Sequence, residues 1–179
     1  MKKTAVVFVM ILVLCACVYA SHRVSVTFDP FTFQHFVQKD GNSKNKVNST
    51  YGIGAGFGYD YCLDNGIRAG ADIKVDTYFL KDQKNFTDLY FLAKAGYVYE
   101  LDEKFNLYGN MKFGLDLQMH DKKTSAVMEF GPEIGAEYKF DEKITFFTSC
   151  EMLFGFPKDD GIKYREFRVT PTLGAGYTF

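Results

Sequence analysis

The sequence predicts an all-β fold: an eight-stranded antiparallel transmembrane β-barrel with the up-and-down topology of a meander. A short motif rich in glycine and aromatic residues recurs at 56–61, 94–99, 135–140 and 174–179, so that its starts are 38, 41 and 39 residues apart. Around these copies, long segments alternate apolar and polar residues with a period of two, which is typical of strands that have one apolar face.

The composition excludes several other classes of protein. The chain has 179 residues, of which 47% are hydrophobic and 24% are charged, so it is far from the signature of a disordered chain. Its mean hydropathy of -0.14 excludes a bundle of transmembrane helices. A net charge of -1 gives no electrostatic reason to expect a nucleic-acid partner. The chain has 12 Tyr and 19 Phe but no Trp, and this aromatic excess needs an explanation.

The repeat sets the number of strands. Each period holds two long alternating segments and not the four short strands of a propeller blade, so each period predicts one hairpin. Each segment is long enough to cross a bilayer at the tilt of a barrel strand. The strands are expected at 23–37, 49–61, 67–80, 87–101, 105–119, 126–140, 144–156 and 167–179.

The alternation favours a membrane barrel over a soluble sandwich. In segment 126–140 one face is apolar from Ala126 to Phe140, while the other carries Glu129, Glu133 and Glu137. Strands of soluble sandwiches are usually about five or six residues long, much shorter than these segments. In lipid, a sheet must close so that every backbone donor and acceptor has a partner.

The first 20 residues predict a secretory signal peptide, which leaves 21–179 as the barrel domain. Lys2 and Lys3 precede an apolar run over 4–18, and Val18-Tyr19-Ala20 offers small residues at the cleavage positions. An alternative interpretation remains open, because Leu14-Cys15-Ala16-Cys17 loosely resembles a lipobox that would place a lipid on Cys17. For Cys62 and Cys150 we expect no disulfide framework.

The lengths of the connections orient the barrel. Short turns are expected at Asp64-Asn65-Gly66, Asp102-Glu103-Lys104 and Asp141-Glu142-Lys143, whereas the other connections, at 38–48, 81–86, 120–125 and 157–166, are longer and polar. Short turns on the periplasmic rim and longer loops on the outer rim are the outer-membrane pattern. Both termini are then expected on the periplasmic side, with the four longer loops exposed at the cell surface.

The repeated motif also predicts an aromatic girdle at the periplasmic end of the strands. Tyrosine suits this level because its ring tolerates the apolar boundary while its hydroxyl reaches water. The expected girdle residues are Tyr59, Tyr61, Tyr97, Tyr99, Tyr138, Phe140, Tyr177 and Phe179.

With these features the mature chain resembles the small outer-membrane barrels of the OmpA/OmpX type. The most specific element is the last strand, which alternates to a C-terminal Phe179. The resemblance implies that this ending is an assembly signal and that the barrel-assembly machinery is a partner, with outer-membrane lipid as the surroundings. Pro171 departs from the pattern, since it lacks a ladder donor and is expected to mark a bulge or local break.

The lumen is the expected place for charged side chains, because an eight-stranded barrel is just wide enough to be filled by them. Ten inward acids against six inward bases leave two interpretations open: a salt-bridge network that plugs the barrel, or a narrow path that prefers cations. Glycines at 52, 54, 56 and 58 leave room for long side chains from opposite strands. The expected network consists of Arg68, Asp72, Lys74, Asp76, Lys94, Lys112, Asp116, Glu129, Glu133, Glu137, Glu151 and Arg168.

No pattern indicates an enzyme. His120 and Ser125 share a loop, but no acid clearly orients the histidine, and a catalytic Ser/His pair must come within hydrogen-bond reach. We therefore expect no catalytic residues, no cofactor and no metal.

The loops are the remaining functional surface. In the four long connections, nine lysines face five aspartates: Lys39, Lys44, Lys46, Lys81, Lys84, Lys122, Lys123, Lys158 and Lys163 against Asp40, Asp82, Asp121, Asp159 and Asp160. Headgroup phosphates or host-surface polyanions are plausible partners of this positive surplus. The expected function is that of a non-enzymatic outer-membrane barrel with a structural or adhesin-like role; a narrow porin-like channel for small solutes or ions is the alternative.

Overall fold

The computed structural model describes residues 20–39, 47–80, 85–120, 123–159 and 162–179, and these form a single closed sheet. No helix among the described residues has the length and apolar character needed to cross a membrane. The strands are β1 (Ala20–Lys39), β2 (Val47–Leu63), β3 (Ile67–Phe79), β4 (Phe86–Glu100), β5 (Phe105–His120), β6 (Lys123–Lys139), β7 (Ile144–Gly155), β8 (Lys158–Asp159) and β9 (Ile162–Thr178).

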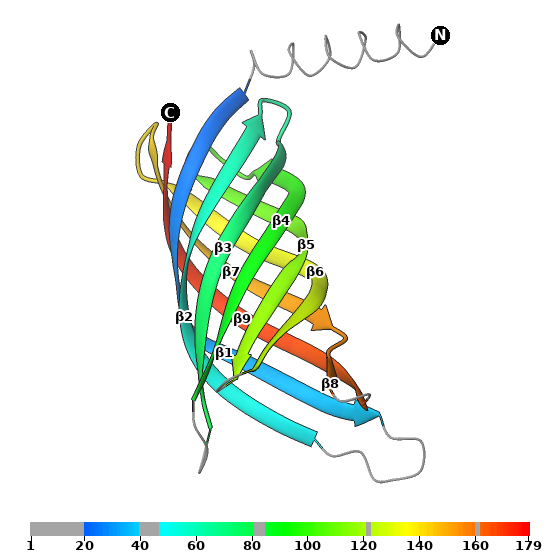
Figure 1. The fold of residues 1–179 in the computed structure, drawn as a ribbon. Helices are drawn as coiled ribbons and strands as arrows, with labels where there is room; N and C mark the ends of the chain where they lie inside the picture. Colours follow the sequence, from blue (N-terminus) through cyan, green and yellow to red (C-terminus); the bar gives the residue numbers. More distant parts are fainter. Residues whose placement is uncertain (1–19, 40–46, 81–84, 121–122, 160–161) are drawn as a thin grey trace, which may run out of the picture.

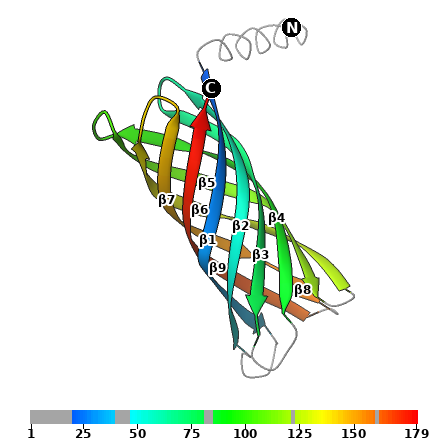
Figure 2. The same ribbon diagram turned by 90° about the vertical axis from the view of Figure 1, so that its left-hand side faces the viewer.

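The topology is an antiparallel meander closed by the first and last strands. Each long strand pairs with the next along the chain, and β1 pairs with β9 from Arg23 opposite Thr178 to Lys39 opposite Lys163. Strand β8 has two residues and only extends the hairpin into β9. The eight long strands therefore form the predicted barrel, with both termini at one end (Figure 1; Figure 2).

The prediction of a loop over the whole of 157–166 is wrong. Residues 158–159 belong to β8 and residues from 162 belong to β9, whose backbone pairs with the end of β1. The reason is that the hydrogen-bonded ladder continues past the apolar band, where the outward side chains are no longer apolar and hydropathy gives no strand signal. Two of the other connections are also shorter than expected, since β1 reaches Lys39 and β2 starts at Val47, while β5 reaches His120 and β6 starts at Lys123. The connection expected at 81–86 keeps its length but lies one residue earlier, at 80–85. Residues 1–19, where the signal peptide and Cys17 lie, are outside the described residues.

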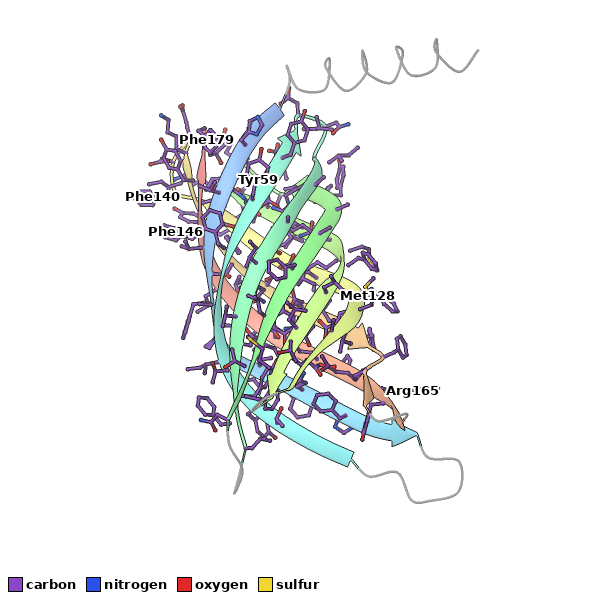
Figure 3. The ribbon with its side chains drawn as sticks, viewed as in Figure 1. Tyr59, Met128, Phe140, Phe146, Arg165 and Phe179 are labelled. Atoms are coloured by element: carbon purple, nitrogen blue, oxygen red, sulfur yellow. The ribbon has the colours of Figure 1, made fainter. Side chains whose placement is uncertain are left out.

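The outer face of the barrel is apolar and the inner face is polar. On β5 the side chains of Met111 and Phe113 are 57% and 54% exposed, whereas Asn110 and Lys112 between and beside them are buried. Strand β6 repeats this pattern, and Met128 points away from the barrel (Figure 3). A soluble protein would show the reverse arrangement, so this distribution fits a barrel whose surroundings are lipid.

A bulge in β1 keeps its polar residues inside. Asp29 pairs with Gly54 and Thr32 pairs with Gly52, so Pro30 and Phe31 together face one residue of β2. Both of these residues are exposed, and the inward set changes from odd numbers up to Asp29 to even numbers from Thr32. If the same sequence continued as a regular strand without the bulge, the side chains of Thr32 and Gln34 would point outward. The same stretch interrupts the pairing with β9 opposite Pro171, which is where a break was expected.

Aromatic side chains gather at the end of the barrel where the termini lie. Of the expected girdle residues, six are exposed, with Phe179 the most exposed at 65%, followed by Tyr99 and Phe140 at 61%. Tyr61 and Tyr138 are only half-exposed, because Tyr61 packs against His22 and Tyr138 against Phe105. Figure 3 shows Tyr59, Phe140, Phe146 and Phe179 at this end. The six exposed residues are Tyr59, Tyr97, Tyr99, Phe140, Tyr177 and Phe179.

The three short turns lie at the same end. Gly66 has a φ of 86°, which an L side chain rarely adopts, so the Asn-Gly turn requires glycine there. The other two turns share a device. Asp102 Oδ1 accepts the backbone N–H groups of Lys104 and Phe105 at 2.8 and 2.7 Å, and Asp141 Oδ1 accepts those of Lys143 and Ile144 at the same two distances. These donors lower the pKa of both aspartates below its ordinary value.

The turn device predicts a pH dependence. Because the pKa of Asp141 is lower in the folded chain than its ordinary 3.8, its stabilising contribution is present above that value and is lost as the pH falls through the folded pKa. Asp141→Ala is expected to lower the denaturant midpoint at neutral pH by a small amount, and the difference from wild type should shrink below about pH 4. Circular dichroism in detergent micelles measures both. Glu142→Ala removes an exposed neighbouring acid and should change neither; an equal effect of the two variants would contradict the assignment.

Candidate functional site

The lumen is filled with charged side chains. All twelve residues of the expected network lie on the inner face, and eleven are buried, while the side chain of the twelfth, Lys94, is 8% exposed. Five further charged residues are buried beside them: Arg23, Asp29, Asp60, Asp88 and Glu166. Asp60 and Asp88 belong to the inward acids that the alternation predicts. Arg23, Asp29 and Glu166 were not predicted, although each alternates with other inward polar residues on β1 or β9.

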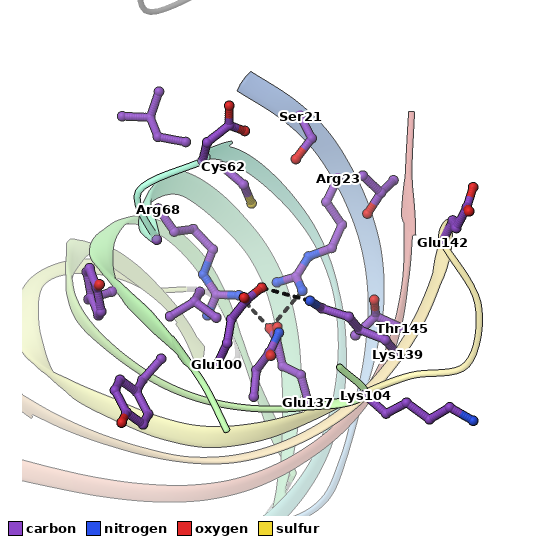
Figure 4. A pocket seen from close by; sticks show the side chains of 18 of the residues that line it. Ser21, Arg23, Cys62, Arg68, Glu100, Lys104, Glu137, Lys139, Glu142 and Thr145 are labelled. Atoms are coloured by element: carbon purple, nitrogen blue, oxygen red, sulfur yellow. Dashed lines mark hydrogen bonds and ion pairs between the residues drawn. The ribbon is translucent and has the colours of Figure 1, made fainter. Parts of the chain in front are cut away.

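The network begins at the end near the termini, which we call the near end. The guanidinium of Arg23 contacts Asp60 and Glu137, both at 2.7 Å. Arg68 contacts the same oxygen of Glu137 at 2.5 Å, and its guanidinium lies 4.2 Å from the centre of the Tyr108 ring. Figure 4 shows Arg23, Arg68 and Glu137 converging. These residues come from β1, β3 and β6, so the contacts tie strands across the lumen.

The middle of the lumen is held by lysines. Lys94 bridges Asp60 and Asp72 at 2.9 and 2.7 Å. Lys112 contacts Asp72, Glu133 and Glu151 at 2.8, 3.2 and 2.7 Å, so one ammonium serves three carboxylates. Lys74 adds a contact with Asp29 at 2.7 Å. Charges this deeply buried are tolerated because they are paired and hydrogen-bonded.

Arg168 is the centre of the half of the lumen farther from the termini, which we call the far half. Its guanidinium contacts Asp76, Glu129 and Glu151 at 3.1 to 3.3 Å and is fully buried. It also lies over the Tyr90 ring, 3.6 Å from the ring centre. A planar guanidinium suits this position because it serves several carboxylates and stacks on an aromatic face at once.

A hydrogen-bonded group of polar side chains continues outward from Arg168. The hydroxyls of Tyr78 and Tyr90 are 3.0 Å apart, and the Tyr90 hydroxyl donates to Asp88 at 3.1 Å. The Gln118 amide donates to Asp116 and to Glu166, both at 2.9 Å. The Gln34 amide also donates to Glu166. The carboxylates here are held by neutral donors more than by cations.

Glycines give these long side chains their space. A Cβ atom on Gly54 would lie 1.9 Å from Asp76 Oδ1, and one on Gly58 would lie 2.7 Å from Asp72 Oδ1. Both glycines are on β2, whose inner face lacks side chains over this stretch. The carboxylates of β3 fill the space that β2 leaves.

Open space lies at the near end. A cavity of about 950 Å³ opens among the short turns and is lined at its floor by Arg23, Arg68 and Glu137 (Figure 4). Deeper in the lumen, between the near end and the lysine layer, a second cavity has a volume of about 20 Å³. That volume holds about one water molecule. The rim carries Lys139 and Glu100, which pair at 2.9 Å and are much more exposed than the residues below.

Two residues that could form a hydrolytic pair, His35 and Ser49, lie close together. His35 Nδ1 lies 3.0 Å from Ser49 Oγ on the neighbouring strand, at the far end and near the surface. Among the described side chains no carboxylate is hydrogen-bonded to the His35 ring, so nothing orients it as a base. The backbone of Ser125 pairs with Gln118, while the side chain of His120 is outside the described residues.

Comparison with known proteins bears on the fold. No protein-family model and no curated protein sequence matches the chain. Among solved structures, the neisserial surface protein A (NspA) matches with a TM-score of 0.64 at 14% identity, covering 89% of this chain and 99% of that one. The outer membrane protease OmpT from Escherichia coli matches at 0.45, with 10% identity and 89% and 97% coverage. Ail of Yersinia pestis, in complex with the heparin analogue sucrose octasulfate, matches at 0.41, with 15% identity and 88% and 99% coverage. At these identities the likeness to NspA concerns the fold, and no activity transfers with it.

The position of Arg168 predicts a large loss of stability on its removal. Arg168→Met leaves the surrounding buried carboxylates without their cation, which should cost about 3–5 kcal/mol of unfolding free energy. Lys139→Met breaks the exposed pair with Glu100 and should cost at most about 1 kcal/mol.

Denaturant unfolding in micelles, followed by circular dichroism and by heat-dependent gel migration, measures both variants. These methods suit the chain because it has no tryptophan to report by fluorescence. Losses of similar size in the two variants would contradict the role given to Arg168.

Proposed function

Because the chain has the fold of the small eight-stranded outer-membrane β-barrels, we propose that it is an integral outer-membrane protein whose barrel is a closed anchor for surface loops. The observation that carries this proposal is the filled lumen. Buried ion pairs cross it from the near end to Arg168, and the cavity found between the first layers has a volume of about 20 Å³. Because the lumen of such a barrel is filled, its loops are the surface that remains available to bind other molecules.

The orientation follows from the position of the turns. The three short turns and both chain ends lie at the near end, which we assign to the periplasm (Figure 1). The signal peptide over 1–20 is part of this proposal, since export precedes insertion. The last strand ends in the exposed Phe179, whose backbone N–H donates to the carbonyl of His22 at 2.9 Å. We assign this strand end to recognition by the barrel-assembly machinery.

The proposed role is non-enzymatic. The nearest arrangement to a catalytic pair, His35 with Ser49, lacks an orienting carboxylate among the described residues. The large cavity at the near end has a mixed lining of acids and bases, in which Arg23 and Arg68 pair with Glu137 and Lys139 pairs with Glu100. Neither place presents a nucleophile with an activated base.

The alternative of a narrow channel for ions or small solutes has less support. It rests on the surplus of acids in the lumen. An acidic lining favours cation passage only if the lining encloses water, and here the acids from the near end to Glu129 are tied to Arg23, Arg68, Lys74, Lys94, Lys112 and Arg168. Opening a path would require breaking several of these buried pairs.

The loops at the far end carry the proposed interaction with other surfaces. Their sequence holds nine lysines against five aspartates, so their field attracts polyanions. Sulfated polysaccharide of a host surface is the partner that we propose, with lipid headgroup phosphate as the competing anion. The barrel would act as a rigid mount for these loops.

Two triple variants test this proposal. Lys39, Lys44 and Lys46 in the far-end loop are replaced by serine in one variant, and Lys104, Lys139 and Lys143 at the near end are replaced by serine in the other. Both remove three positive charges, but at opposite ends of the barrel. Binding of the folded protein in micelles to immobilised heparin is measured for each. Three exposed ion pairs contribute about 0.2–1 kcal/mol each, so the far-end variant should bind about threefold more weakly or worse.

The near-end variant is expected to bind heparin as wild type does. Equal weakening by both variants, or no binding by wild type, would count against a loop-mediated role. Repeating the measurement with anionic phospholipid vesicles separates the two anions. If the far-end lysines govern vesicle binding but not heparin binding, the partner is the membrane surface and the proposed host partner is wrong.

A further inference from the structure

The buried charges of the lumen are unevenly distributed along the barrel. From the near end to the middle, five cations face six carboxylates: Arg23, Arg68, Lys74, Lys94 and Lys112 against Asp29, Asp60, Asp72, Glu133, Glu137 and Glu151. In the far half, Arg168 is the one described cation among five buried carboxylates, which are Asp76, Asp88, Asp116, Glu129 and Glu166. The excess negative charge is therefore concentrated in one place.

Three of the far-half carboxylates converge on a point. Asp116 on β5, Glu129 on β6 and Glu166 on β9 each offer one oxygen, and these oxygens lie within 4.8 Å of one another. All three residues are buried, with exposed fractions of 0, 0 and 2%. Buried like charges this close to one another are strongly unfavourable unless something of opposite charge lies between them.

The existing partners of these carboxylates do not satisfy them. Arg168 contacts Oε2 of Glu129, while the buried Oε1 of Glu129 has no hydrogen-bond partner. The amide of Gln118 occupies Oδ2 of Asp116, while the buried Oδ1 of Asp116 has none. Buried polar atoms are nearly always paired, so two orphaned oxygens within one carboxylate cluster leave acceptors that a bound cation can take up.

We propose that Asp116, Glu129 and Glu166 form a binding site for a calcium ion. Carboxylate oxygens are hard ligands, and calcium binds them at 2.3–2.6 Å in flexible geometry, so two oxygens on opposite sides of the ion are about 5 Å apart. The observed spread of the three oxygens fits that span. Magnesium demands near-ideal octahedral geometry and usually keeps several waters, so a site made of carboxylates from three strands suits it less well.

Groups around the site support it. Gln118 donates to both Asp116 and Glu166, and Gln34 donates to both Glu166 and Asp88, so the ligand side chains are held in place by two amides. Such hydrogen bonds orient the ligands of metal sites. Arg168 holds Glu129 through Oε2 and leaves its Oε1 without a partner.

The site would join three strands at the end of the barrel where the loops begin. Between β6 and β9 lies Gly155 of β7, which pairs with both Glu129 and Glu166 and has no side chain to separate them. An ion here crosslinks β5, β6 and β9 through side chains, in addition to the backbone ladder. Calcium is thus expected to stabilise the far end, independently of what the loops bind.

The test uses the protein refolded in detergent with calcium, since the site is buried and an ion enters it most readily before the barrel closes. Equilibrium dialysis with radiolabelled calcium, after removal of weakly held ions, should give one calcium per barrel. Glu129→Gln and Glu166→Gln keep the shape of the side chain and remove one ligand charge. Each should weaken calcium binding by at least about tenfold.

Glu133→Gln is the matched control, because it removes a buried lumen carboxylate of the lysine layer and should leave the stoichiometry and affinity unchanged. Heat-dependent gel migration confirms that each variant is folded. No bound calcium in the wild type, or equal loss in Glu133→Gln, would overturn the proposal.

Thermal unfolding with calcium or with a chelator gives an independent result. Calcium should raise the melting temperature of wild type and of Glu133→Gln but not that of Glu166→Gln. In chelator, Glu166→Gln should melt no lower than wild type, because the substitution relieves repulsion among the remaining carboxylates. Anomalous diffraction from calcium-soaked crystals should place a peak between the three carboxylates; a peak confined to the loops would contradict the site.

Discussion

The backbone of a chain in lipid must satisfy its own hydrogen bonds, and this constraint governs the rest of the structure. The pairing of β1 with β9 meets it by removing the two free edges that a flat sheet would leave. Once the sheet is closed, alternating side chains are divided between lipid and lumen, so residues such as Phe113 and Lys112 occupy opposite faces although they are neighbours in the chain. The bulge at Pro30 and Phe31 shows how strictly this division is kept.

Closure also creates the electrostatic problem that the lumen solves. Polar side chains that point inward leave water as they fill an interior of this width, and buried charges need partners. Arg23, Lys112 and Arg168 each serve two or more carboxylates. The glycines of β2 make room for Asp72, Lys74 and Asp76. The near half has about as many cations as carboxylates, whereas in the far half carboxylates outnumber cations and oxygens of Asp116 and Glu129 are left without a hydrogen-bond partner.

Much of this architecture was predictable from the sequence, because period-two alternation is a local signal. It predicts the strands, the faces of 105–119 and 126–140, and the inward position of all twelve expected charged residues. Glu166 is absent from the expected network because the apolar residues that define the last expected strand begin at Phe167, whereas β9 starts at Ile162. Arg23 lies within the strand expected at 23–37, and the same alternation places it on the inner face.

Other features depend on contacts that alternation does not encode. Which carboxylate meets which cation depends on the tilt and stagger of strands that are far apart in the chain, as for Lys74 with Asp29 or Arg168 with Asp76. The concentration of acids in the far half therefore appears only when the strands are placed in register. The fold can be predicted from local sequence patterns, whereas the candidate site depends on how closure of the barrel brings distant strands together.

The lumen of the barrel is closed by the protein's own side chains. Single-channel recording of the purified, folded protein in a planar lipid bilayer tests this most directly, with insertion verified by recovery of the heat-modifiable form from the same bilayer lipids. If side chains close the lumen, no conductance above background is expected in concentrated salt at either polarity. Discrete, reproducible current steps that favour cations and that change in Glu129→Gln or Arg168→Met would show a conducting lumen and contradict it.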